Sequence, residues 1–196
     1  MKKAIFYMKQ GIDILVTLPT ERRGLGLRYG QLGKLYCDQG DIISCISLIK
    51  DALKINREFN DSRNEVKNLI QLGLSYNKLH NYEESIKYLS LAIELSEKYE
   101  FLELEKEANH ELGFIHSEIL ENYDKAYIYF SRASELLGKI LGNLIKESIE
   151  FKFISPAQDL VLMYQGLLEK YHIESIRNYK ENTEILKRAF NRFVDQ

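Results

Sequence analysis

The sequence repeats one short pattern at an interval of 40 residues. A Leu-Gly pair is followed three residues later by tyrosine or histidine, at Gly33 with Tyr36, at Gly73 with Tyr76 and at Gly113 with His116. Three alanines keep the same phase further along each interval, with spacings of 40 and 41: Ala52, Ala92 and Ala133. A fixed period of this length indicates an array of similar structural units, each too small to bury its own apolar face. This periodicity limits the possible folds more than any other feature of the chain.

The repeated glycines indicate close contacts between helices. Glycine in a helix interior costs about 1 kcal/mol relative to alanine, so three glycines at one phase need a packing reason. A missing side chain lets two helix backbones approach closely while larger neighbours interdigitate around the contact. We therefore expect each glycine to face a small residue of the following helix. The candidates are Cys45 or Ala52 for Gly33, Ser85 or Ala92 for Gly73, and Ala126 or Ala133 for Gly113.

The pattern resembles the tetratricopeptide repeat (TPR), an antiparallel helix pair with a Leu-Gly, an aromatic residue and small residues in its second helix. The resemblance is clearest over residues 72–92 and covers about residues 4–137. It implies an all-α fold, a right-handed superhelical solenoid of antiparallel helix pairs. The structural repeat positions would be Gly33, Tyr36, Ala52, Gly73, Tyr76, Ala92, Gly113 and Ala133.

The repeat predicts how the chain is divided. A TPR array would occupy residues 1–138 and a degenerate helical region, residues 139–196, would cap it. Within the array we expect a half-repeat at 1–19 and full repeats at about 21–59, 62–99 and 102–138. Gly11 precedes Ala52 by 41 residues, so the first helix has the register of a second helix. We therefore expect either a piece of a longer protein or the loss of one helix.

Composition and charge exclude several classes of protein. The chain of 196 residues is 45% hydrophobic and 29% charged, contains two prolines and has almost no strand-like alternation, as expected of a folded, soluble helical protein. Its net charge of −2 gives no argument for nucleic acid or an anionic membrane surface as a partner. No apolar run approaches the 18 or so residues that span a bilayer. We expect neither nucleic acid nor membrane among its partners.

Cys37 and Cys45 are the only cysteines. They lack the spacing of metal ligands and are interpreted as two separate thiols, each a small apolar packing residue in a reducing compartment. This interpretation predicts a cytoplasmic location and no metal site.

Two stretches superficially resemble catalytic or cofactor motifs. The string GLGLRYGQLG, residues 24–33, has the glycines of a dinucleotide-binding loop but not the preceding strand. The string HELGFIH, residues 110–116, has its histidines six residues apart rather than the four that a zinc-protease helix needs. We therefore predict no catalytic residues, no cofactor and no enzymatic activity. An unrecognised active site in the irregular region 141–156 is the alternative.

The resemblance also predicts where a partner binds. In a TPR array the first helices line a concave groove, and their inward residues contact a protein or peptide segment. The groove candidates are Lys34, Asp38, Ile70, Leu74, Asn77, Lys78, His110, Phe114 and Ser117. The carboxylate clamp of chaperone-binding TPR domains is not formed, because the matching positions hold Gly30, Lys34, Gln71, Glu107 and Glu111.

Residues 4–19 are similar to the AxxYxxKGxxLLxxLP-like segment that introduces TPR arrays in bacterial signal-transducing ATPases, cyclases and kinases. This resemblance implies an adaptor, or the interaction or sensor segment of a larger signalling protein. The alternative is a peptide-pheromone-type regulatory receptor whose superhelix pitch changes on ligand binding. The N-terminal half-repeat should expose part of an apolar stripe, through which a homodimer could form. The stripe consists of Ile5, Phe6, Met8, Ile12 and Leu15.

Overall fold

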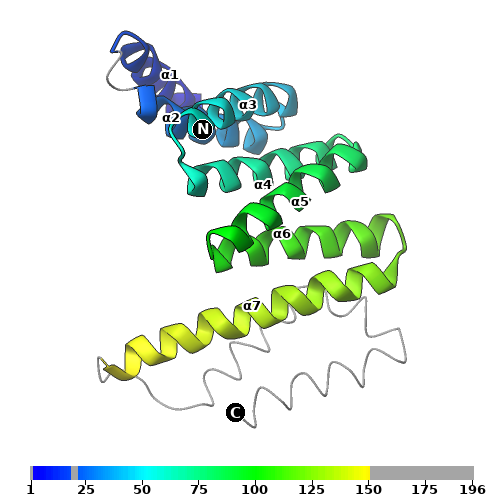
Figure 1. The fold of residues 1–196 in the computed structure, drawn as a ribbon. Helices are drawn as coiled ribbons and strands as arrows, with labels where there is room; N and C mark the ends of the chain where they lie inside the picture. Colours follow the sequence, from blue (N-terminus) through cyan, green and yellow to red (C-terminus); the bar gives the residue numbers. More distant parts are fainter. Residues whose placement is uncertain (1, 19–21, 151–196) are drawn as a thin grey trace. The chain divides into compact units, whose positions relative to one another are not determined.

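The chain folds into successive antiparallel helices, as the computed structural model shows for residues 2–18 and 22–150 (Figure 1). Every element in those ranges is helical, which confirms the predicted all-α solenoid. The elements are α1 (Lys2–Val16), α2 (Arg22–Gln39), α3 (Ile42–Glu58), α4 (Ser62–Lys78), α5 (Tyr82–Lys98), α6 (Leu102–Phe114), the π-helical turn η2 (Ile115–Ile119) and α7 (Tyr123–Glu150).

The helices end at a regular interval because one residue in each turn adopts a left-handed conformation. These residues are spaced by 20, 20, 20 and 21: Gly40 (φ 88°), Asn60 (φ 53°), His80 (φ 57°), Glu100 (φ 56°) and Glu121 (φ 49°). A left-handed residue lets the following N–H bond a carbonyl in the last helical turn, as Asp61 N does to Asn56 O at 2.8 Å. The next helix is then capped by a side chain, for example that of Asp61, which accepts from Asn64 N.

The glycines of the repeat lie where two helices cross, as predicted. A Cβ added at Gly73 would lie 2.6 Å from Leu89 Cγ and 3.3 Å from the backbone oxygen of Ser85. At Gly33 it would lie 2.7 Å from Ile49 Cδ1 and 3.3 Å from the backbone oxygen of Cys45. The expected close approach to the second helix is therefore confirmed in both pairs. The space that each glycine leaves is filled by a large aliphatic side chain four residues beyond the small residue.

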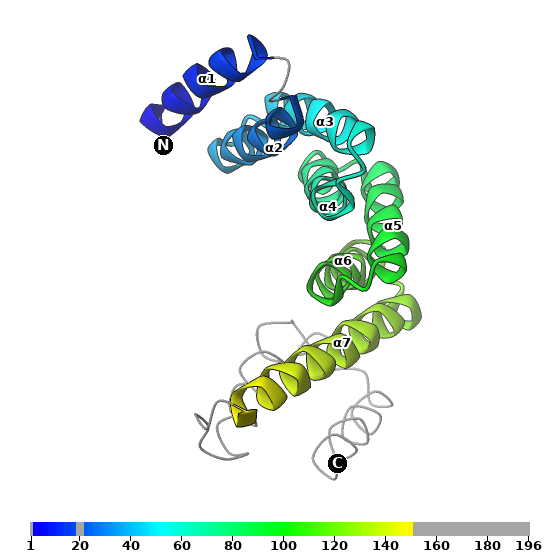
Figure 2. The same cartoon turned by 60° about the vertical axis from the view of Figure 1, so that its left-hand side comes forward.

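Two compact units divide the chain, residues 1–108 and the part that begins at Asn109. In the first unit, α2 and α4 lie on one side and α3 and α5 on the other (Figure 2). Helix α1 packs on α2 through Ile5 and Ile12, which share a core cluster with Leu25, Leu32 and Ile55. The first unit therefore has the two layers expected of stacked helix pairs, in which first helices contact first helices.

The second unit contains one residue more than the 40-residue period, and this residue is accommodated within the helix that α6 begins. The spacing from Ala92 to Ala133 is 41 rather than 40, and α6 continues as the π-helical turn η2 instead of ending. A π turn takes one more residue than an α turn, which accommodates the insertion. The repeat glycine is crowded here too, but by a large side chain and not by the expected Ala126 or Ala133, since a Cβ on Gly113 would lie 2.8 Å from the Phe130 ring.

Helix α7 runs to Glu150 and so extends into the region expected at 139–196. The remaining part of the region expected at 139–196, including the irregular stretch beyond 150, lies outside the described residues. The boundary at 138 and the capping role of this region stay predictions.

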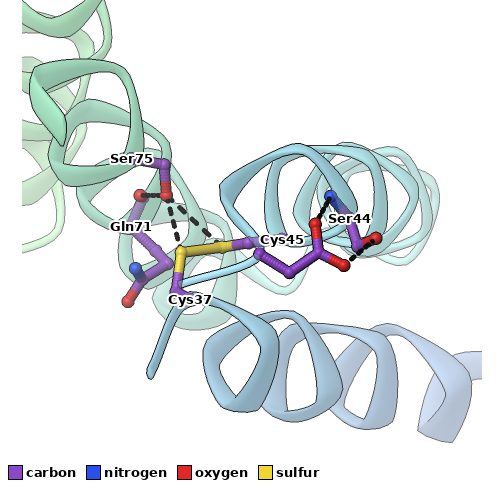
Figure 3. The surroundings of a disulfide bond; sticks show 6 residues. Cys37, Ser44, Cys45, Gln71 and Ser75 are labelled. Atoms are coloured by element: carbon purple, nitrogen blue, oxygen red, sulfur yellow. Dashed lines mark hydrogen bonds between the residues drawn. A yellow bond between two sulfur atoms is a disulfide. The ribbon is translucent and has the colours of Figure 1, made fainter. Parts of the chain in front are cut away.

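The interpretation of the cysteines as separate thiols is wrong. Cys37 and Cys45 form a disulfide, with their Cα atoms 5.2 Å apart (Figure 3). The tight turn at Gly40 brings the end of α2 against the start of α3, so that positions eight residues apart face each other. A spacing of eight residues does not match a metal site, but it does match two positions that face each other across the turn of a helical hairpin. Both residues are buried, as expected, with 3% and 0% exposure.

A serine of the next helix lies against the disulfide. Ser75 Oγ in α4 is 3.1 Å from Cys37 Sγ and 3.4 Å from Cys45 Sγ, and it donates a hydrogen bond to Gln71 O at 2.6 Å (Figure 3). Disulfide sulfurs carry no proton and can only accept weakly. The covalent link and its polar neighbour thus join three helices of the first unit.

Candidate functional site

A cavity of about 380 Å³ opens among the helices of the first unit. Helices α2 and α4 supply most of its lining, α3 contributes Ile49 and Asn56, and the first turns of α6 contribute Leu104 and Glu107. The apolar part of the lining includes Leu27 and Ile70. Its size falls within the range usual for small-ligand pockets.

Amide side chains dominate the polar part of this cavity: Gln31, Asn56, Asn64, Asn68 and Gln71. Asn56 is 2% exposed and Asn68 is 6% exposed. Within the part of the chain that the structure describes, the Nδ2 atoms of both residues are buried without a hydrogen-bond partner. Leaving a buried donor unsatisfied costs about 1–3 kcal/mol. Two such donors in one cavity lining require an explanation.

Two glycines of α2 make room for these amides. A Cβ added at Gly26 would collide with Asn56 Oδ1, and one added at Gly30 would lie 3.0 Å from Asn68 Oδ1. The GLGLRYGQLG stretch is therefore not a phosphate-binding loop, because its glycines accommodate the side chains of α3 and α4. Each glycine adds its own cost of about 1 kcal/mol to the helix. At each of the two positions, the fold therefore loses stability in two ways, through the unsatisfied amide donor and through the glycine opposite it.

The charged residues of the lining are two lysines and one glutamate. Lys34 and Lys67 are exposed, and neither forms an ion pair within the described ranges of the chain. Glu107 is the single acidic residue of the lining. Hydrogen-bond donors therefore outnumber anionic acceptors in the cavity, and its ionisable side chains carry a net positive charge.

The structure places the predicted groove residues in three locations. Lys34 and Ile70 line the cavity, with Ile70 itself buried. Four others lie on α2 and α4 outside that lining: Asp38, Leu74, Asn77 and Lys78. The remaining three, His110, Phe114 and Ser117, belong to the second unit. The cavity therefore brings together two of the predicted residues.

Sequence reasoning missed the two buried asparagines and the glycines opposite them. Asn56 directly follows Ile55 in an otherwise apolar stripe, and Asn68 directly precedes Leu69. An amide at a buried helical position was one available signal. The second was the excess of glycines in α2 over α4 and α6, which contain only the repeat glycine.

In the second unit, His116 occupies the aromatic position of the repeat. It is buried and stacks on Tyr129 with ring centroids 5.4 Å apart. Burial, reinforced by the charge of Lys125, lowers the pKa of His116 below its ordinary 6.5. The neutral imidazole therefore takes the packing place that Tyr76 fills in the central repeat, where Tyr76 stacks on Tyr88.

Within the described ranges, 2–18 and 22–150, no three histidine, cysteine or acidic side chains lie close enough together to hold a metal ion. None of the helices in those ranges has the length and hydropathy needed to cross a bilayer.

Comparison with known proteins agrees with this architecture. The family model for the tetratricopeptide repeat matches residues 27–98, which correspond to most of α2 and all of α3 to α5. Residues 27–98 therefore carry tetratricopeptide repeats. TPR units generally mediate protein interactions, and helical repeat folds of this type are typically not enzymes.

A curated relative and a solved structure extend the comparison. The chain is 24% identical over 162 residues to the transcriptional activator NprA of Geobacillus stearothermophilus, which covers 80% of this chain. It spans 36% of the length of that relative. The crystal structure of BtubC (BKLC) from P. vanneervenii superposes with a TM-score of 0.61 at 19% identity, over 72% of this chain and 58% of that one. The second likeness shows the fold alone.

Proposed function

We propose that this chain is a peptide- or protein-binding TPR module that holds a segment of its partner in the cavity of the first unit. The observation that carries the proposal is the cavity of about 380 Å³, whose polar lining is dominated by amide side chains. A peptide has a carbonyl acceptor and an N–H donor at every residue, and both can bond to amide side chains. The module acts by binding and has no catalytic activity of its own.

We assign the module to regulation, as an adaptor or as the sensor segment of a larger signalling protein. The similarity to part of a transcriptional activator supports this assignment. The same similarity favours a second candidate, a peptide-pheromone-type receptor in which the ligand changes the pitch of the helical array. We propose the cytoplasm as its compartment. Two separate thiols would have supported a cytoplasmic location. The disulfide between Cys37 and Cys45 does not, since disulfides are uncommon in the cytoplasm.

The proposed partners are therefore proteins or peptides rather than nucleic acids or membranes. Beyond the cavity, the bound segment would extend along the predicted groove residues of α2 and α4. A second copy of the chain is a further proposed partner, through the exposed face of α1. Phe6 is 57% exposed and Tyr7 66% exposed on that helix.

Selection from a random peptide library tests the binding function. The full chain is immobilised and panned against phage-displayed dodecapeptides, and enriched sequences are synthesised with a fluorescent label. We expect saturable binding, and we expect the peptide to protect amide protons of α2 and α4 from hydrogen exchange. Failure to enrich any sequence, or protection confined to α7, would refute the proposed site.

A pair of surface substitutions provides the matched control. Leu27 lines the cavity and is 42% exposed, whereas Leu91 lies on α5 outside it and is 39% exposed. Leu27→Glu should weaken the selected peptides at least tenfold, because it places a charge in the apolar part of the lining. Leu91→Glu should leave their affinity unchanged. Equal effects of the two substitutions would contradict a site in this cavity.

A further inference from the structure

The serine beside the disulfide has an acceptor that only a reduced cysteine could use. The single hydroxyl proton of Ser75 is donated to Gln71 O at 2.6 Å, so the lone pairs of Ser75 Oγ are left for the two sulfurs (Figure 3). These sulfurs, Cys37 Sγ and Cys45 Sγ, lie 3.1 and 3.4 Å from that oxygen. A disulfide has no proton to donate to it, whereas a thiol has one. Breaking the S–S bond would therefore give Ser75 a hydrogen-bond donor that the oxidised pair lacks.

Among the three repeats, a hydroxyl occurs at this position only beside the cysteines. The positions 40 residues before and after Ser75 hold Leu35 and Ile115. Ser75 is as fully buried as Ile115, each with 0% exposure. Burying a hydroxyl costs free energy unless its hydrogen bonds are made, so an aliphatic side chain would be the better packing residue here. The serine is therefore explained by the sulfurs that it faces and not by the repeat.

The turn between α2 and α3 does not depend on the covalent bond. Asp41 N donates to Tyr36 O at 3.0 Å across this turn. The same bond recurs at the next turn, where Asp61 N donates to Asn56 O at 2.8 Å and no cysteine is present. Reduction should therefore leave the backbone of the turn in place and keep the two thiols close enough to form the bond again.

We propose that Cys37 and Cys45 are a reversible redox pair that undergoes thiol–disulfide exchange with a low-molecular-weight thiol. Ser75 is its positioning residue, because it accepts a hydrogen bond from the reduced pair. A thiolate of the reductant attacks Cys37 Sγ, the S–S bond breaks, and Cys45 leaves as a thiolate that takes up a proton. A second molecule of reductant cleaves the mixed disulfide at Cys37 and departs with the first as their oxidised dimer. Two molecules of thiol are oxidised and one protein disulfide is reduced to two thiols.

A redox pair also agrees with the compartment proposed above. Cytoplasmic disulfides are usually transient and either catalytic or redox-sensing. Cys37 is 3% exposed and Cys45 0%, so exchange requires a local opening of the turn and begins at Cys37. The inference does not depend on peptide binding, and either proposal can fail without the other.

Equilibration with glutathione tests the pair in the full chain. The protein is incubated in mixtures of reduced and oxidised glutathione, quenched with acid and labelled with a maleimide, and the modified thiols are counted by mass spectrometry. We expect a reversible change from no thiols to two as the mixtures become more reducing, while circular dichroism shows that the chain stays folded. Structural disulfides generally resist reduction by glutathione. A disulfide that persists in reduced glutathione alone, or that is reduced only when the chain unfolds, would overturn the proposal.

Two buried serines provide a matched comparison. Ser75→Ala removes the acceptor beside the sulfurs, so half-reduction should require a mixture at least threefold more reducing, which is about the effect of one net hydrogen bond. Ser75→Thr keeps the hydroxyl and should keep the wild-type midpoint. Ser85 is equally buried, but its hydroxyl donates to Gly73 O at 2.7 Å and does not face the disulfide. Ser85→Ala should therefore leave the midpoint unchanged.

The remaining outcomes also decide the question. Two thiols in every mixture would show that the bond does not form, and the redox pair would be refuted. Equal midpoints in the wild type and Ser75→Ala, or equal shifts in the two alanine variants, would remove Ser75 from the proposal. If Ser75→Ala does not fold, the wild-type titration still shows whether the pair is reversible.

Discussion

Single glycines decide how closely the helices of each repeat approach. Gly73 leaves the space into which the buried side chain of Leu89 fits, and Gly33 does the same for Ile49. Gly26 and Gly30 instead make room for amides. Gly24 is different again, because nothing lies within 4 Å of a Cβ added there. Glycine therefore has three distinct roles within the same type of helix.

Substitution of these glycines by alanine should have opposite effects on stability. Gly73→Ala places a methyl group 2.6 Å from Leu89 Cγ in a closely packed crossing, and we expect a loss of about 1–3 kcal/mol in the free energy of unfolding. Gly24→Ala meets no neighbour and should raise it by about 0.5–1 kcal/mol. Urea denaturation followed by circular dichroism measures both. A similar change in the two variants would contradict the packing role of Gly73.

Stability should also depend on the protonation of His116. Burial lowers its pKa in the folded chain below the ordinary 6.5, so the unfolded chain binds the proton first as pH falls. This residue's contribution is therefore fully present above pH 6.5 and declines between 6.5 and the lower folded pKa. His116→Tyr, which restores the residue found at positions 36 and 76, should reduce the loss of stability between pH 7.5 and pH 5.5. Identical pH profiles for the two proteins would disprove the assignment.

For single residues, the sequence predicts which positions pack between helices better than it predicts which positions line the cavity. Gly73 and Ala92 could be assigned because the repeat shows each position three times. Asn56 and Asn68 occur outside that pattern, and their importance depends on which side chains of other helices face them. That information lies in the fold and not in the local sequence.

Helix ends are the most regular feature at the scale of elements. Left-handed residues recur every 20 residues through α2 to α6, but only the first is glycine. Non-glycine residues are disfavoured in this conformation by about 1–2 kcal/mol. The residue after each of the first three left-handed positions caps the next helix through its side chain, as Asp41, Asp61 and Asn81 do, and such caps mark where a helix begins.

Replacing one of these residues by glycine should stabilise the chain. Glu100 has a φ of 56° and is exposed. Glu100→Gly should raise the free energy of unfolding by about 0.5–1 kcal/mol, after allowance for the greater freedom of glycine in the unfolded chain. Glu94→Gly, at an exposed position within α5, should lower it by about 1 kcal/mol. Thermal unfolding of the two variants, run side by side, tests whether the sign depends on φ.

The disulfide should contribute to the stability of the α2–α3 hairpin. It closes a short loop, with a sequence separation of 8, and loops of this size are associated with about 2–3 kcal/mol in the chain-entropy account. Dithiothreitol should therefore lower the urea midpoint of the wild type but not that of Cys37→Ala/Cys45→Ala. Thiol titration in denaturant without reductant provides the direct check. Two reactive thiols per chain would show that the bond is absent.

Element boundaries were predictable, but the response to an inserted residue was not. The spacing of 41 between Ala92 and Ala133 shows that the third interval contains an additional residue but not where it lies. The structure accommodates it in the π turn η2, while Glu121 keeps the left-handed role. Periodicity reveals that a residue has been added, whereas the choice between a longer loop and a wider helical turn depends on tertiary packing that the local sequence does not show.

For the whole molecule, repetition predicts architecture and leaves the partner open. The all-α solenoid follows from positions that recur, since recurrence marks residues that every unit needs. The cavity depends on residues that do not recur, namely the amides, the extra glycines and the two lysines. What distinguishes one repeat from the next is therefore the best guide to what this array binds.

The last prediction concerns helix α1. This helix has the register of a second helix, but the space beside its repeat position, Gly11, is empty. Gly11 corresponds to Ala52, which is fully buried, yet nothing lies within 4 Å of a Cβ added at Gly11. Ile5 and Ile12 face α2 and are buried, whereas Phe6, Ile14 and Val16 are each more than half exposed. Such a face favours association with a second copy.

Sedimentation velocity over a hundredfold range of concentration should then show reversible self-association of the full chain. Phe6→Glu should weaken it, because the charge would have to be desolvated in the interface. Ile43→Glu is the matched control, since Ile43 is 70% exposed at the start of α3, whereas the α3 residue that shares a core cluster with α1 is Ile55, near the other end of that helix. It should leave association unchanged. A sedimentation coefficient that stays constant over the whole range, or equal weakening by both substitutions, would rule out α1 as a self-association surface.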